Sequence, residues 1–127
     1  MTSISTRTMT RFPHIRFVVP HCGAFLPYML QRFAGVSRIL AQYGVMEPTD
    51  VYEEARGLWY DVAGDPEPVA LDMLRMVAPA DHIVYGSDYP HSPAPIVVPK
   101  KRALEADPRF ADVDLRANGM RLLGGSA

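Results

Sequence analysis

The chain has 127 residues, the size of one ordinary domain, and its 48% hydrophobic content is enough to form a buried core. Its 13 Lys and Arg residues are balanced by 14 Asp and Glu residues, so it lacks the excess positive charge of nucleic-acid-binding domains. No apolar run approaches the roughly 18 residues that cross a bilayer. These properties predict a single globular domain over residues 1–127, with neither a nucleic-acid partner nor a membrane segment.

Cysteine content and the first residues bear on where the protein works. A single cysteine, Cys22, cannot form an internal disulfide, which predicts a reducing compartment and therefore the cytoplasm. Residues 1–12 carry Arg7 and Arg11 without an acidic residue, as organelle transit peptides do. We favour a short piece of helix before the first strand, because such a composition specifies targeting only loosely.

The first half of the chain predicts two strands separated by a helix. Residues 15–19 are apolar and β-branched and end at Pro20, which is typical of a strand buried on both faces. Apolar positions then recur every three or four residues from about 25 to 43, which predicts a helix. Residues 58–62 predict the second strand, with Asp61 near its end.

The second half repeats this pattern. Residues 65–67 (Asp-Pro-Glu) are a typical helix start and predict a helix that runs to about Ala78. Residues 83–87 predict the third strand, which delivers Asp88 into a proline-rich loop at 89–95.

Two further helices are predicted at about 100–106 and 113–123, the last stopped by Gly124-Gly125. Strands that alternate with helices predict an α/β fold with right-handed βαβ units and a parallel sheet. A complete (β/α) barrel needs about 250 residues and eight strands, so the chain is well short of a whole barrel.

His21 and Asp88 are the candidate catalytic residues, because each follows a predicted strand. In parallel α/β folds the side chains just past the carboxyl ends of the strands line the active-site face. If the first and third strands flank the second, their backbones lie roughly 10 Å apart. The two side chains can then face a common centre, and a metal-bound water would fit between them. Spacing alone leaves structural alternatives open: a hydrogen-bonded structural His and an Asp that caps a loop.

The other polar candidates are weaker. We expect Asp61 to hydrogen-bond loop amides instead of acting in catalysis. His14 and His82 precede strands, so we expect both to lie at the opposite end of the sheet as structural or exposed residues. Nothing around Cys22 activates a thiolate, so we expect a small packed residue there.

Four segments stand out together: residues 11–27 (RFPHIRFVVPHCGAFLP), 59–64 (WYDVAG), 83–90 (IVYGSDYP) and 118–123 (NGMRLL). In this order they resemble the sixth-strand region, the seventh strand, the eighth strand and the closing helix of the amidohydrolase-related family. The resemblance is to its branch with 6-methylsalicylate and aminocarboxymuconate-semialdehyde decarboxylases. The resemblance implies a partial (β/α)8 TIM barrel, comprising about the last three βα units and the closing helix.

The resemblance also implies roles for individual residues. His21 would be the general acid or base that hydrogen-bonds a metal-bound water, and Asp88 a metal ligand that assists proton transfer. The ion would be divalent, zinc or manganese, and the substrate a small aromatic or unsaturated carboxylic acid. His91 stands where relatives carry a residue that faces the substrate, so it is a weak candidate for substrate binding, with an ordinary loop residue as the alternative.

The sequence departs from the family in its metal ligands. The family's His-x-His after its first strand and its His after the fifth are unmatched, because no two of the four histidines, at 14, 21, 82 and 91, stand two apart. Catalytic zinc sites use about three protein ligands, and one carboxylate cannot hold the ion tightly. We therefore expect the metal to be weakly bound or absent in this chain alone.

Three functions remain open. The leading hypothesis is a truncated or split decarboxylase. The second keeps the fold but hydrolyses a lactone or related ester. The third is a non-catalytic partial barrel that works only with a chain carrying the missing strands. A partial barrel exposes open strand edges, so we also expect a homo-oligomer or a complementing chain.

Overall fold

Three parallel strands form the centre of the structure, in the spatial order β1-β2-β3. The computed structural model describes residues 8–64 and 68–124. Strand β1 (Val18–Val19) pairs with β2 (Trp59–Asp61), and β2 pairs with β3 (Ile83–Val84). The predicted parallel sheet is confirmed, and the first and third strands flank the second.

All three strands are shorter than predicted. The sequence predicted strands at 15–19, 58–62 and 83–87. Single backbone hydrogen bonds, from Trp59 to Phe17 (2.9 Å) and from Val62 to Val84 (3.3 Å), extend the paired segments slightly. An apolar run predicts burial, but a ladder also needs a neighbouring strand in register, and here that register covers only a few residues.

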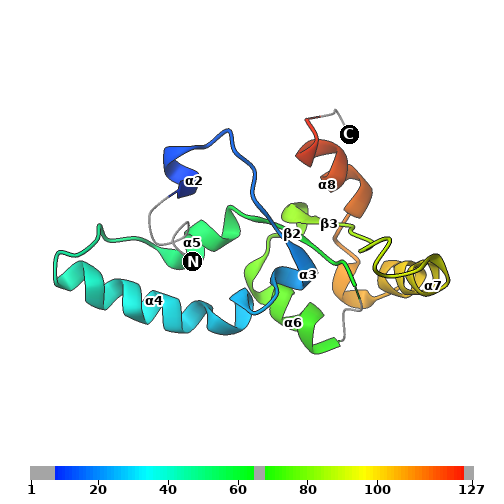
Figure 1. Cartoon of the computed structure of the whole chain (residues 1–127), viewed down its shortest axis with the longest axis horizontal. Helices are drawn as coiled ribbons and strands as arrows, with labels where there is room; N and C mark the ends of the chain where they lie inside the picture. Colours follow the sequence, from blue (N-terminus) through cyan, green and yellow to red (C-terminus); the bar gives the residue numbers. More distant parts are fainter. Residues whose placement is uncertain (1–7, 65–67, 125–127) are drawn as a thin grey trace.

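Helices lie before, between and after the strands along the chain (Figure 1). They are α2 (Thr8–Arg11), α3 (Pro20–Gly23), α4 (Leu26–Gln42), α5 (Val51–Arg56), α6 (Pro68–Val77), α7 (Ala94–Glu105) and α8 (Leu115–Leu122), with 3-10 turns η1 (Ala80–His82) and η2 (Pro108–Phe110). The helices predicted at about 25–43, to about 78 and at 113–123 are confirmed within a few residues by α4, α6 and α8. The helix start predicted at 65–67, residues 1–7 of the predicted N-terminal helix, and Gly125 lie outside the described residues.

Two helices differ from the prediction. Helix α5 lies in the polar stretch 47–56, where the sequence predicted no helix. Its first turn is capped by Asp50, which accepts hydrogen bonds from the backbone N–H groups of Tyr52 and Glu53. Helix α7 begins at Ala94 instead of about 100. Pro95 stands in its first turn, where no intrahelical N–H bond is needed, so the proline-rich sequence starts a helix that the prediction placed later.

The core lies between the sheet and the helices. Tyr60 of β2 and Ile83 of β3 are completely buried, and Leu30 of α4 is 2% exposed. In contrast, Val18 on the edge strand β1 is 42% exposed and Tyr28 of α4 is 74% exposed. Within the described residues, apolar side chains on the edge strand β1 and on α4 are therefore exposed.

In residues 8–64 and 68–124, no helix is both long and apolar enough to cross a membrane.

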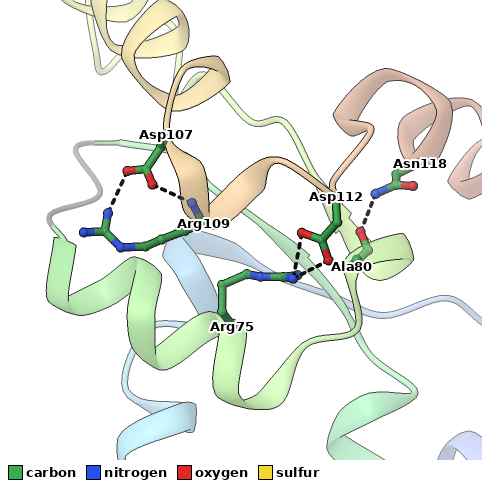
Figure 2. A network of polar contacts seen from close by, with 6 residues as sticks. All are labelled: Arg75, Ala80, Asp107, Arg109, Asp112 and Asn118. Carbon is green, nitrogen blue, oxygen red and sulfur yellow. Dashed lines mark hydrogen bonds and ion pairs between the residues drawn. The ribbon is translucent and has the colours of Figure 1, made fainter.

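Polar contacts fasten the last third of the chain to α6 and η1 (Figure 2). Arg75 of α6 donates two hydrogen bonds to the carboxylate of Asp112, at 2.9 and 2.7 Å. Arg109 of η2 pairs with Asp72 of α6 at 2.6 Å and with the adjacent Asp107, also at 2.6 Å. Ion pairs of this partly exposed kind stabilise a fold by only about 0–1 kcal/mol each.

Asn118 of α8 makes the buried contact in the same region. Its side chain is 2% exposed and donates from Nδ2 to the carbonyl oxygens of Ala80 (2.8 Å) and Ile83 (2.7 Å), while its Oδ1 accepts from Arg121. A buried carbonyl that loses its partner costs about 1–3 kcal/mol. Asn118 therefore anchors α8 to the start of β3.

We predict that Asn118→Ala lowers the free energy of unfolding by about 2–3 kcal/mol, because it removes the donors to two carbonyl groups. Urea unfolding followed by the fluorescence of Trp59, the single tryptophan, measures the change. Arg116→Ala, at an exposed position of the same helix, is the matched control and should cost less than about 0.5 kcal/mol. Equal losses in the two variants would contradict the anchoring role.

Candidate functional site

The carboxyl ends of the three strands meet at one edge of the sheet, and the sequence-predicted residues follow them. His21 comes two residues after β1, Asp61 ends β2, and Asp88 follows β3 by four residues. Because the strands are parallel and β2 is central, His21 and Asp88 follow the two outer strands on the same edge. The side chain of His21 is exposed and that of Asp88 is half-buried.

A left-handed turn carries His21 out of β1. His21 and Cys22 have φ values of 53° and 56°, and Ala24 has a φ of 50°. Residues with a Cβ pay roughly 1–2 kcal/mol each for this conformation, so surrounding contacts must hold the turn. The sequence predicted the end of the strand at Pro20, but gave no sign of the turn apart from Gly23, whose φ is 82°.

Asp61 supplies the contact that holds this turn. Its Oδ1 accepts hydrogen bonds from the backbone N–H of His21 at 2.8 Å and from that of Ala63 at 3.0 Å. The predicted role of Asp61, hydrogen bonding to loop amides, is confirmed. Sequence reasoning missed that one of these amides belongs to His21, because that contact joins residues 40 positions apart.

Glycines make room for both side chains. A Cβ on Gly86, just past β3, would lie 3.0 Å from Cγ of Asp61, and a Cβ on Gly64 would lie 3.2 Å from Nδ1 of His21. Gly64 also has a φ of +80°. The ring itself approaches Ala63, with His21 Nδ1 3.4 Å from the carbonyl oxygen. Glycines shortly after the second and third strands were the available sequence signal for this close packing.

Asp88 also has a left-handed backbone, with a φ of 59°, and begins a tight turn. Its carbonyl accepts the N–H of Ser92 at 2.8 Å, and its Oδ2 accepts the hydroxyl of Ser92 at 3.1 Å. Among the described residues Oδ1 has no hydrogen-bond partner, so this oxygen is available to a ligand. His91 is exposed in the same turn, and its role in substrate binding stays a prediction.

The donors among the described residues do not complete a metal site by themselves. Within residues 8–64 and 68–124, no group of three or more His, Cys, Asp or Glu side chains is placed to hold an ion. Asp88 can contribute one carboxylate oxygen, and a tightly bound catalytic ion needs about three protein ligands.

The remaining histidines lie away from this edge. His82 precedes β3, stacks on Trp59 with ring centroids 4.7 Å apart, and places Nδ1 3.1 Å from the carbonyl of Leu58. Its predicted structural role is confirmed. His14 precedes β1 and is exposed.

Cys22 is a packed residue, as predicted. Its side chain is 3% exposed, and burial, with a smaller contribution from the negative charge of Asp61, raises the pKa of the thiol from 9.0 to about 11. The thiol form is therefore favoured over the reactive thiolate.

We predict that Cys22 in the folded chain reacts with a disulfide reagent at least about 100-fold more slowly than in the urea-unfolded chain at pH 8. A pKa higher by two units lowers the thiolate fraction by about that factor, and burial slows access further. Because the folded-state pKa is the higher one, this group's contribution to stability is present below pH 9 and is lost as the pH rises towards 11. Equal rates in the two states would contradict the packing of Cys22.

We predict that Gly64→Ala lowers the free energy of unfolding by about 1–2 kcal/mol, because the new Cβ strains a left-handed residue and presses on the His21 ring. Gly35→Ala is the matched control, since a Cβ in the middle of α4 meets nothing within 4 Å. That change should stabilise the chain by about 0.5–1 kcal/mol. Urea unfolding of both variants measures the difference, and a loss confined to the Gly35 variant would refute the crowding at His21.

Comparison with known proteins identifies relatives of this chain. The chain is 26% identical over 106 residues to the 6-methylsalicylic acid decarboxylase of Penicillium expansum. The match covers 84% of this chain but only 33% of that protein. The chain therefore spans about a third of the length of this relative.

Solved structures share the fold. The 5-carboxyvanillate decarboxylase of Sphingomonas paucimobilis matches with a TM-score of 0.80 and 20% identity, over 98% of this chain and 38% of that one. A 5-carboxyvanillate decarboxylase of Novosphingobium aromaticivorans, crystallised with manganese, matches with a TM-score of 0.76 and 18% identity, over 96% and 36% of the two chains. These shares fit a partial (β/α)8 barrel, as the sequence resemblance implied.

The profile of the family described as Amidohydrolase matches residues 3–123, which is nearly the whole chain. The order of motifs, the parallel strands and the polar residues at their carboxyl ends agree with that match. The chain therefore belongs to the amidohydrolase family.

Proposed function

We propose that this chain forms the His21 and Asp88 side of the active site of a metal-dependent, non-oxidative decarboxylase of an aromatic carboxylic acid. The observation that carries the proposal is that His21 and Asp88 follow the two outer strands at the same edge of a parallel sheet. The relative named as a 6-methylsalicylic acid decarboxylase supports the reaction class. The expected cytoplasmic location is part of the same proposal.

The two residues have different tasks. Asp88 offers one carboxylate oxygen to a divalent ion, zinc or manganese, and the other ligands come from outside the described residues. Bound there, such an ion would supply positive charge that holds the substrate's carboxylate. His21 handles the proton: when the bond to the carboxylate breaks, its electron pair stays on the ring carbon, and that carbon must gain a proton as carbon dioxide leaves.

A specific observation favours a second candidate, a partial barrel that acts only with a partner chain. No metal-binding group is complete within the described residues, and the sheet has an uncovered edge at β1. A second copy of this chain would repeat the same donors, so a complementing chain with the missing ligands fits this candidate better than a homo-oligomer.

We predict that the isolated chain, purified without chelator, contains far less than one zinc or manganese ion per polypeptide by elemental mass spectrometry. A chimaera in which residues 3–123 replace the matching segment of the Penicillium expansum decarboxylase should bind the metal and release carbon dioxide from 6-methylsalicylate. His21→Asn and Asp88→Asn should each lower the rate by at least about 100-fold, because each removes a group that acts on the reaction.

Matched controls and alternative products make the test decisive. His14→Asn and Asp81→Asn, exposed and at the opposite end of the strands, should leave the rate of the chimaera unchanged. Ring opening of a lactone without carbon dioxide would indicate the hydrolase alternative. A metal-loaded chimaera whose activity survives both Asn substitutions at 21 and 88 would refute the proposed roles.

A further inference from the structure

We propose that Asp61 is the positioning residue for His21, and that through Ala63 it sets which nitrogen of the His21 ring carries the proton. The inference rests on the proposed function, because it assigns His21 a proton-transfer role. Asp61 itself needs no contact with substrate.

The Asp61 carboxylate contacts both the turn after β1 and the loop after β2. One oxygen, Oδ1, accepts the backbone N–H of His21 at 2.8 Å and that of Ala63 at 3.0 Å. Hydrogen bonds to an ionised acceptor are stronger than those between neutral groups. Asp61 therefore joins the turn after β1 to the loop after β2 at a single atom.

The sheet and a neighbouring glycine allow the carboxylate to take this position. Asp61 is the last residue of β2, the strand paired on both sides, so its backbone is fixed by the sheet. A Cβ on Gly86 would lie 3.0 Å from Cγ of Asp61, so the glycine leaves the space that the carboxylate occupies.

Ala63 links Asp61 to the imidazole ring of His21. It is 8% exposed and donates its N–H to Asp61, while its carbonyl oxygen lies 3.4 Å from Nδ1 of His21. A carbonyl oxygen only accepts hydrogen bonds, so this contact favours the neutral ring that carries its proton on Nδ1. The same carboxylate fixes the backbone of His21 and the residue that its ring approaches.

The contact with Ala63 determines which nitrogen of the His21 ring can transfer a proton. With Nδ1 protonated and directed at Ala63, the lone pair of the neutral ring resides on Nε2. Nε2 is then the nitrogen that takes up and releases the catalytic proton. The left-handed backbone of His21, held by Asp61, sets where this nitrogen points.

Nitrogen-15 NMR of the isolated full chain tests the proposal without any activity. At about pH 9, where histidine rings are normally neutral, we expect the His21 ring to be mainly in the Nδ1–H form. The signals that disappear in His21→Asn assign this ring. A wild-type ring mainly in the Nε2–H form would overturn the proposal, whether or not any variant folds.

Variants test the role of Asp61. Asp61→Ala should shift the ratio of the two tautomers about fivefold towards Nε2–H, the effect of losing one net hydrogen bond of about 1 kcal/mol, and should speed hydrogen exchange at the His21 amide. Asp61→Asn keeps an oxygen acceptor and should retain the wild-type ratio. Asp50→Ala is the matched control, since Asp50 also accepts two backbone N–H groups but caps α5 away from His21, so it should leave the ratio unchanged.

The outcomes separate this inference from the proposed function. An Asp61→Ala chain that folds, as its amide spectrum would indicate, yet keeps the wild-type tautomer ratio and amide exchange, would refute the positioning role. A confirmed tautomer combined with an inactive, metal-loaded chimaera would refute the decarboxylase assignment and leave the positioning role standing.

Discussion

The structure depends on the double pairing of β2. This strand lies between β1 and β3, and its central residue Tyr60 is completely buried, with its hydroxyl donating to the carbonyl of Ala55 at 2.7 Å. Burial raises the pKa of Tyr60 above its ordinary value, so the neutral hydroxyl is the stable form. Helix α3 packs on this strand, whereas α8 packs on the neighbouring strand β3. The last residue of β2, Asp61, binds two backbone N–H groups in the loops that carry the candidate site.

Two turns hold the candidate residues His21 and Asp88 in place. The turn at His21 is held in an uncommon backbone conformation by Asp61, and Asp88 is held in another by its own turn with Ser92. Strain of this kind persists only where neighbouring contacts maintain it, and it concentrates at functional sites. Yet the donors needed for a metal ion are not all within the described residues. In the proposed function, His21 and Asp88 form one part of the active site, and further metal ligands complete it.

The packing of the edge strand β1 differs from that in a closed barrel. In a closed barrel each edge strand has a neighbour, which removes unpaired backbone groups. Here Val18 on β1 and Tyr28 on α4 remain substantially exposed, while Asn118 and the ion pairs of α6 secure the other side. In Figure 1, α4 lies at the lower left and α8 at the upper right. Helix α8 contacts β3, whereas α4 contacts α5 and α6.

The sequence by itself determined the α/β class, the order of the elements, the family and the placement of His21 and Asp88 after strands, because these follow from local periodicity and from short motifs. It did not determine the true lengths of the strands, the capped helix α5 or the early start of α7, where pairing register and caps override composition. Only the tertiary structure placed the carboxylate of Asp61 against the amide of His21, since that contact joins residues 40 positions apart. Local patterns identify which residues follow each strand, but only the folded sheet decides which of them touch.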